Sequence, residues 1–230
     1  MASKNDTKPC SSSLDLPHTQ KQYVLAKGYR RMYNSAQGNG GGIMAYYGIK
    51  RKVFISFYQK DRAEVDAFID RWATREGVFI PKALGVSYND DIIDSNNPEY
   101  VMAQIRAKYL GDSTVTVVLL GTCTHSRRYV DWEIKASLTQ GEDPPNGLIG
   151  ILLPLRKSAY LPPRFMNNWN AEHRDCYARY YCAPSAADEL GRWIEDAFQA
   201  RTARAKLIKN SQEMMKNNAK CQVCGITHPA

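Results

Sequence analysis

From about residue 50 onward, apolar residues alternate between short continuous runs and runs with helical spacing. Lys52–Phe57 is rich in β-branched and aromatic residues, which predicts a strand. In Asp61–Arg75, apolar residues recur at i, i+3, i+4 and i+7 from Val65, the spacing of a helix with one buried face. A strand followed directly by an amphipathic helix is the first half of a β-α-β unit.

The same alternation continues along the chain. Pro98–Leu110 and Ser126–Leu138 read as helices, and Thr114–Leu120 and Leu148–Leu153 are apolar almost throughout. Unbroken apolar strands are typical of a sheet covered on both faces. Strands that alternate with helices therefore predict an α/β fold, a central parallel sheet with helices on both faces.

Other stretches are less regular. Val78–Ile80 and Leu84–Ser87 are candidate short strands, and residues 154–183 show no clear period. A long amphipathic helix is expected to start near Ser185. Its basic second half, 201–216, is expected to project into solvent.

Composition and charge divide the chain into three parts. Hydrophobic residues make up 43% and charged residues 23%, as in a folded soluble protein. The net charge is +8, but residues 49–200 hold nineteen basic and twenty acidic side chains, so the excess lies in 1–48 and 201–230. We predict an N-terminal extension (1–48, with a possible helix over 20–36), one domain (49–200), and a basic C-terminal helix and tail (201–230). A basic excess confined to the ends disfavours nucleic-acid binding.

The sequence also bears on location. Six irregularly spaced cysteines do not form a disulfide framework, which indicates a reducing compartment. No apolar run approaches the roughly 20 residues of a membrane span. The first 25 residues lack an apolar signal core. We therefore expect a cytoplasmic protein without membrane contact.

Ligands of open α/β sheets bind outside the carboxyl ends of the strands. That rule selects Ser56–Lys60, Ser87–Asp94 and Gly121–Glu133. None contains a G-x-x-x-x-G-K-[ST] loop or a G-x-G-x-x-G turn, which disfavours an NTPase or a Rossmann dehydrogenase. A phosphorylatable receiver is also disfavoured, because Ser56-Phe57-Tyr58 offers no acidic pair after the first strand.

Four blocks in order carry a family resemblance: Lys52–Tyr58, Asp112–Thr122, Arg127–Ile134 and Gly147–Leu153. Together they resemble the TIR-like domain of the Thoeris ThsB family over about residues 50–155. Leu190–Phe198 resembles the closing Trp-containing helix of that family. The resemblance implies a flavodoxin-like or TIR-like arrangement of the sheet.

TIR domains carry a Trp-Cys-x-x-Glu block after the third strand, and the corresponding positions here are Tyr129-Val-Asp-Trp-Glu133. The Trp and Cys are replaced and the carboxylate is present. The resemblance thus implies that Glu133 is catalytic, in an NAD⁺ nucleosidase or ADP-ribosyl cyclase that breaks the nicotinamide–ribose bond. The product would be a cyclic ADP-ribose-type signal that activates a separate effector in anti-phage defence.

Several partner expectations accompany that activity. NAD⁺ is then the substrate, so no cofactor is expected. A homo-oligomer and a phage-derived trigger are possible partners. The alternative reading is a TIR-like adaptor or scaffold that acts through protein contacts.

Helical geometry permits the catalytic placement of Glu133. At 100° per residue it lies beside the buried stripe of Val130 and Ile134, on the same flank as Ser126. An ionised carboxylate there would stabilise the oxocarbenium character that develops on the ribose. Spacing alone favours a solvated helix carboxylate at Glu133, and the family resemblance is what favours the catalytic reading.

The remaining candidates contact substrate in this interpretation. Ser56 could bond ribose or phosphate, and Phe57 and Tyr58 could stack on a ring, although both read equally as core or rim packing. Asn89 and Asp90 could bond ribose hydroxyls or shape a turn.

Three further positions on or near the predicted helices have expected places. Ser126 and Trp132 complete the expected substrate-binding set, with Trp132 pointing away from the buried stripe toward 154–183 or a neighbouring subunit. Asp61 is expected to be a helix N-cap.

The C-terminus holds half of a zinc knuckle, Cys221-Gln-Val-Cys224 with His228. Three ligands do not complete a tetrahedral site, so the sequence alone predicts no metal centre. A fourth ligand would require the tail to fold back onto another cysteine, for which the candidates are Cys10, Cys176 and Cys182.

Overall fold

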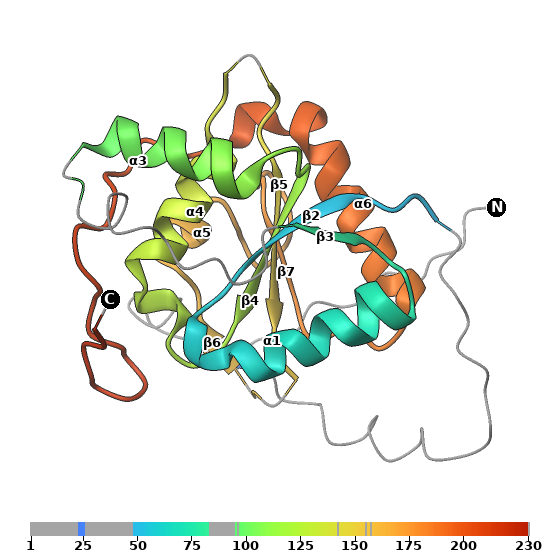
Figure 1. Cartoon of the computed structure of the whole chain (residues 1–230), viewed down its shortest axis with the longest axis horizontal. Coiled ribbons are helices and arrows are strands. Elements are labelled where there is room, and N and C mark those ends of the chain that lie inside the picture. The colour runs from blue at the N-terminus through green and yellow to red at the C-terminus, as the bar shows by residue number, and fades with distance from the viewer. Residues whose placement is uncertain are drawn as a thin grey trace.

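A computed structural model describes residues 23–25, 48–82, 95, 97–141, 143–154, 156 and 158–229. Its centre is a five-stranded sheet, every strand parallel to its neighbours, in the order β3-β2-β4-β5-β7 (Figure 1). The strands are β2 (Lys52–Ser56), β3 (Ile80–Lys82), β4 (Val115–Leu120), β5 (Gly147–Leu152) and β7 (Arg179–Tyr181).

Helices cover both faces of the sheet. One face packs on α1 (Arg62–Ile69), which a π-helical turn extends through Asp70–Arg75, and on α6 (Ala187–Ala203). The other face packs on α4 (Arg128–Leu138) and α5 (Pro163–Asn167). On that side α3 (Pro98–Gln104), continued as a helix over Ile105–Leu110, packs against α4 and β2.

The alternation of side chains in β4 shows why a two-sided sheet needs apolar residues throughout. Val117 and Leu119 enter the apolar cluster shared with α1 and α6, whereas Val118 and Leu120 enter the cluster shared with α4 and α5. All six residues of the strand are buried. The predicted parallel sheet with helices on both faces is confirmed.

The chain order of the strands reverses between β2 and β4. β2 pairs with β3 on one side and with β4 on the other, and Ser56 at the end of β2 lies opposite Val118. In open α/β sheets such a switch point, on the side of the carboxyl ends, is where ligands bind.

Two stretches differ from the sequence prediction. Residues 154–183 contain β6 (Ser158–Tyr160), α5 and the edge strand β7, which are too short to show a period. Part of the possible helix over 20–36 is instead β1 (Tyr23–Leu25), which pairs antiparallel with β6. The candidate strand near Val78 begins at Ile80, and Leu84–Ser87 lies outside the described residues.

The expected C-terminal helix begins at Ala187 and ends at Ala203, so the prediction of a helix projecting over 201–216 is wrong. After a 3-10 turn at Ala205–Leu207, residues 208–229, here the C-terminal segment, return along α4 (Figure 1, red). Asn168 fixes the return, because its side chain accepts from the Lys209 N–H at 2.8 Å and donates to the Lys209 carbonyl at 2.9 Å. None of the helices in the described ranges has the length and apolarity of a membrane span.

Candidate functional site

The carboxyl ends of β2 and β4 bring two predicted segments together at the switch point. Ser56–Tyr58 ends β2, and Gly121–Ser126 links β4 to α4. Helix α4 is anchored by Val130 and Ile134 in the apolar cluster below it. Its first turns therefore stand over the carboxyl end of the sheet.

Glu133 contacts Ser56 at this end of the sheet. The Ser56 hydroxyl is fully buried and donates to Glu133 Oε2 at 2.5 Å, while the Glu133 side chain is half-buried. An O–H···O⁻ bond of this length is typical of a charge-assisted contact. Ser56 and Glu133 are 77 positions apart in the chain, so the sequence-predicted pair is joined by the fold.

Tyr58 lies at the rim of the same site beneath the buried guanidinium of Arg127, 4.5 Å from its ring centre. Arg127 also donates to the carbonyls of His228 at 3.2 Å and Pro229 at 3.4 Å. The His228 ring lies 5.7 Å from the Tyr58 ring. The end of the C-terminal segment therefore borders the candidate site.

Two other predicted residues, Phe57 and Ser126, lie in different surroundings. Phe57 packs against the apolar cluster on the α1 and α6 face. Ser126 is buried and donates its hydroxyl to the Cys123 carbonyl at 2.9 Å. Asn89 and Asp90 lie outside the described residues. The structure thus joins Ser56 to Glu133 and places Tyr58, two residues after Ser56, against Arg127 and His228. We take Ser56, Tyr58 and Glu133 as the candidate site.

Trp132 is buried in the cluster that joins α4 to α3, with its ring edge-on to Tyr129 at 5.4 Å. Its indole N–H donates to the Met215 carbonyl at 2.8 Å. The side chain therefore faces α3 and the C-terminal segment, and not residues 154–183.

Asp61 occupies the N-cap position of α1 but its side chain makes no capping hydrogen bond, so the predicted cap is wrong. Its carboxyl instead accepts from Arg156 at 3.3 Å, and burial raises its pKa. A Cβ at Gly121 would lie 2.0 Å from Asp61 Oδ2, so this close approach requires glycine at the end of β4. Sequence analysis missed Arg156, which comes from an irregular loop.

The N-terminus of α4 is capped from a distant part of the chain. Arg127 at the N-cap position makes no side-chain cap, and Asn218 Oδ1 accepts from the Arg128 N–H at 2.8 Å. The neighbouring Ala219 N–H donates to the Ser126 carbonyl at 2.9 Å. No local signal could identify Asn218, because it lies 90 positions away.

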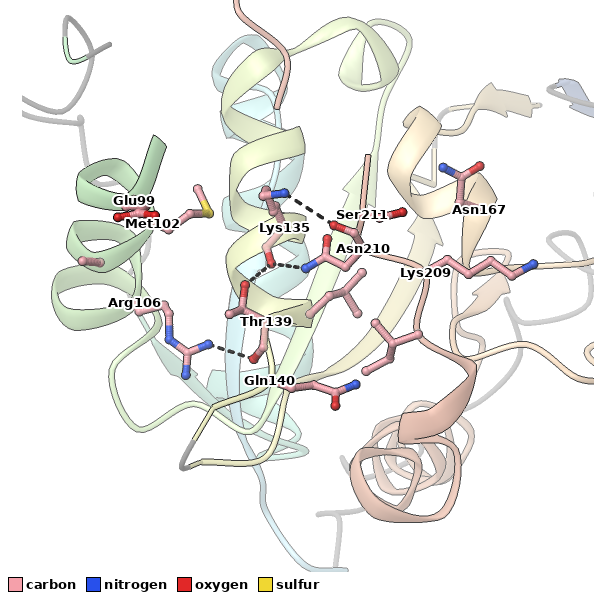
Figure 2. A pocket seen from close by; sticks show the side chains of 13 residues that line it. Glu99, Met102, Arg106, Lys135, Thr139, Gln140, Asn167, Lys209, Asn210 and Ser211 are labelled. Atoms are coloured by element: carbon pink, nitrogen blue, oxygen red, sulfur yellow. Dashed lines mark hydrogen bonds between the residues drawn. The ribbon is translucent and has the colours of Figure 1, made fainter. Parts of the chain in front are cut away.

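A hollow of about 1030 Å³ lies between α3, α4 and the C-terminal segment (Figure 2). Two of its cations are bonded to carbonyls: Arg106 donates to Thr139 at 2.9 Å, and Lys135 donates to Asn210 at 3.4 Å. It lies around the second half of α4, toward the amino ends of the strands, as does a second hollow of about 770 Å³ beside Asn146. Neither lining includes Ser56 or Glu133, so the candidate site lies apart from both hollows.

One comparison with known proteins gave a match. Residues 54–158 match the family model of the Thoeris protein ThsB, TIR-like domain. No curated protein sequence matches the chain. The matched segment contains Ser56, Tyr58 and Glu133 and excludes the C-terminal segment. It supports a part in Thoeris anti-phage defence, and residues 54–158 are similar to the TIR-like domain of the Thoeris ThsB family.

Proposed function

We propose that this protein cleaves NAD⁺ at the nicotinamide–ribose bond and converts the ADP-ribose part into a cyclic messenger. The observation that carries the proposal is the Ser56–Glu133 contact at the switch point, within the family-matched segment. The messenger would diffuse to a separate effector in Thoeris defence. NAD⁺ is the substrate in this proposal, and no cofactor takes part.

The chemistry suits a single carboxylate. Nicotinamide is cationic in NAD⁺, so it leaves as a neutral molecule with both electrons of the broken bond and needs no general acid. Positive charge then develops on the ribose, where an ionised Glu133 would stabilise it electrostatically. The Ser56 hydroxyl supports this role, because a donor to a carboxylate favours its charged form.

Formation of a cyclic product requires that an internal nucleophile reaches the ribose before water does. That nucleophile gives up a proton as it forms the new bond, which replaces the bond to nicotinamide. Exclusion of water favours the internal attack. The C-terminal segment beside Tyr58 is suited to that exclusion, since it covers the rim of the site with His228 and Pro229.

The proposal is tested with the purified full chain and NAD⁺ by measuring free nicotinamide. Glu133→Gln keeps the shape of the side chain and removes its charge, and we expect nicotinamide release to fall by about 100-fold or more. Glu133→Ala should behave in the same way. Glu172→Gln, at an exposed turn, is the matched control and should keep the wild-type rate. Wild-type activity that survives both Glu133 substitutions would remove Glu133 from catalysis.

Ser56 acts as a positioning residue in this account. Ser56→Ala removes the donor to Glu133 without touching the carboxylate. We expect a lower rate with a pH profile displaced toward higher pH, because the charged form of Glu133 loses its hydrogen bond. A lower rate with an unchanged profile would indicate only a packing role for Ser56.

A non-catalytic adaptor is the competing outcome. Such a protein would release no nicotinamide in the purified state or in phage-challenged cells, yet would still be required for defence. Defence that survives Glu133→Gln unchanged would favour the adaptor.

A further inference from the structure

The last nine described residues, 221–229, gather a set of soft ligands against the loop that follows β4. Cys123 Sγ lies 3.2 Å from Cys221 Sγ and 3.6 Å from Cys224 Sγ, and Cys224 Sγ lies 3.2 Å from His228 Nε2. The ligand atoms of Cys123, Cys224 and His228 all lie within 4.8 Å of one another. Cys123 is thus the candidate for the fourth ligand of the C-terminal half-knuckle, and Cys221 joins this group of three through its 3.2 Å contact with Cys123.

These separations are close to those around a tetrahedral ion, although two of them, at 3.2 Å, are slightly short; both sulfur–sulfur distances are too long for a disulfide. Zinc binds thiolate sulfur at about 2.3 Å and imidazole nitrogen at about 2.0–2.1 Å, which places ligand atoms about 3.4–3.8 Å apart. A disulfide would require about 2.05 Å between sulfurs. All three cysteines are free thiols in the structure.

The backbone of the C-terminal turn has the geometry of a ligand-holding knuckle. Gly225, directly after Cys224, has φ +70°, a conformation that favours glycine. Its N–H donates to the Cys221 carbonyl at 2.9 Å, and the Cys221 N–H donates to the Ile226 carbonyl at 2.9 Å. These two hydrogen bonds close the turn that carries Cys221 and Cys224.

Side chains outside the cluster hold the knuckle in place. His125 Nε2 accepts from the Gln222 N–H at 3.1 Å, and Asn218 Nδ2 donates to the His228 carbonyl at 3.2 Å. Arg127 donates to the same carbonyl at 3.2 Å. Three thiolates and a neutral imidazole around a divalent ion leave one net negative charge, which the buried Arg127 guanidinium offsets.

We propose that Cys123, Cys221, Cys224 and His228 form a structural Zn²⁺ site that fastens the C-terminal segment to the switch point. Four protein ligands close the coordination shell, as in structural sites, and leave no position for substrate. None of the four ligands belongs to the Ser56–Glu133 pair, so metal binding can be tested separately from NAD⁺ cleavage. Its effect is to keep the end of the chain beside Tyr58 and over the N-terminus of α4.

The test is the metal content of the full chain, purified under reducing conditions and measured by mass spectrometry. We expect about one zinc per chain. Replacement of that zinc by Co²⁺ should give the visible absorption of a tetrahedral cobalt–thiolate centre.

Substitutions distinguish the proposed metal ligands from a cysteine outside the cluster. Cys224 is exposed and His228 is at the surface, so Cys224→Ser and His228→Gln should fold, as circular dichroism would verify. Each should bind Zn²⁺ at least tenfold more weakly than the wild type in competition with a chromophoric chelator. Cys176→Ser is the matched control, since that thiol donates to the Ala178 carbonyl away from the cluster, and it should leave affinity unchanged.

Three results would overturn the proposal. A reduced, folded chain that binds no Zn²⁺ or Co²⁺ would show that the thiols are not a metal site. Unchanged Zn²⁺ affinity in folded Cys224→Ser and His228→Gln would assign the metal elsewhere. Quantitative formation of a Cys123–Cys221 disulfide in place of metal binding would make the cluster a redox pair. Because the readout is metal content, none of these results depends on whether the protein cleaves NAD⁺.

Discussion

The family-matched domain and the C-terminal segment are held by different forces. The domain buries continuous apolar clusters on both faces of its sheet. Within residues 208–229, Cys221 is the one fully buried side chain. The segment is attached largely through its backbone, which receives hydrogen bonds from Trp132, Arg164 and Asn168 on the domain. Its partly buried Ile208 and Met214 add contacts at the edges of the apolar clusters. Apolar burial makes the domain a cooperative unit, whereas polar contacts make the segment specific and releasable.

The largest effect is expected at Arg164, where the two regions meet. Its guanidinium is fully buried, pairs with the buried Asp131 at 2.9 Å, and donates to the Gln212 and Glu213 carbonyls. Arg164→Met leaves Asp131 without its partner, so we expect the free energy of unfolding to fall by about 3–5 kcal/mol. Urea unfolding measures the loss. Trypsin should also cut faster at the exposed Lys216 and Lys220.

The control for this prediction is Arg174→Met, because Arg174 is exposed. It should change neither stability nor trypsin sensitivity. Equal stability of the Arg164 and Arg174 variants would contradict the account of Arg164 as the joint between the two regions.

A core variant should weaken the domain without freeing the segment. Leu119 is fully buried in the cluster shared by α1 and α6, far from the C-terminal segment. Leu119→Ala should lower the free energy of unfolding by about 2–5 kcal/mol. Under native conditions the rate of tryptic cleavage at Lys216 and Lys220 should stay at the wild-type value. Ile80→Ala, at a partly exposed edge position, should cost much less.

The comparison would fail if folded Leu119→Ala released its C-terminal segment as readily as Arg164→Met. That result would mean that the segment depends on the apolar core as a whole.

Loss of the helix cap that Asn218 supplies should do the opposite of Leu119→Ala: it should free the C-terminal segment while lowering the stability of the domain only slightly. Asn218→Ala removes the acceptor for the Arg128 N–H and the donor to His228, so we expect a stability loss of about 1 kcal/mol. Tryptic cleavage of the segment should rise well above the wild-type rate. Asn217→Ala, at the exposed neighbouring position, is the matched control. A larger loss of stability without faster cleavage would show that Asn218 belongs to the core.

The smallest expected effect is on how the stability of the domain depends on pH. Burial, with Arg179 nearby, lowers the pKa of His173 from its ordinary 6.5 to about 4. Between pH 6.5 and about pH 4, His173 is protonated in the unfolded chain and neutral in the folded chain. The free energy of unfolding therefore decreases as the pH is lowered through that window. His173→Asn suits the positive φ of this position and should flatten the dependence between pH 6.5 and 4. An equal slope in both proteins, measured by urea unfolding, would contradict the assignment to His173.

The sequence predicted the parts of the molecule that depend on apolar periodicity. The strand over Thr114–Leu120 and the helix over Ser126–Leu138 were close to the observed β4 and α4, because each buries a regular set of apolar residues. β7 was missed because three residues carry no measurable period. The return of the C-terminal segment was missed because it depends on hydrogen bonds from side chains such as Asn168 to the backbone of the segment. No residue spacing in the sequence predicts such bonds.

The candidate site was predictable to the same extent. The position of Glu133 on its helix followed from its spacing to Val130 and Ile134, and the strand-end rule identified Ser56. That the two touch depends on the register of β2 against β4, which no local pattern supplies. The contact between Cys123 and the C-terminal half-knuckle could not be predicted from the sequence, because Cys123 and Cys221 are 98 positions apart and only the folded chain brings them together.

The central claim is that the Glu133 carboxylate drives NAD⁺ cleavage, and it is tested most directly in cells exposed to phage. Cells that carry the full chain, its Glu133→Gln variant or its Glu172→Gln control would be compared by mass spectrometry for nicotinamide and cyclic ADP-ribose-type nucleotides. We predict that both products rise on infection with the wild type and the control and stay at background with Glu133→Gln. Equal product in all three strains, with equal protein levels, would contradict the claim.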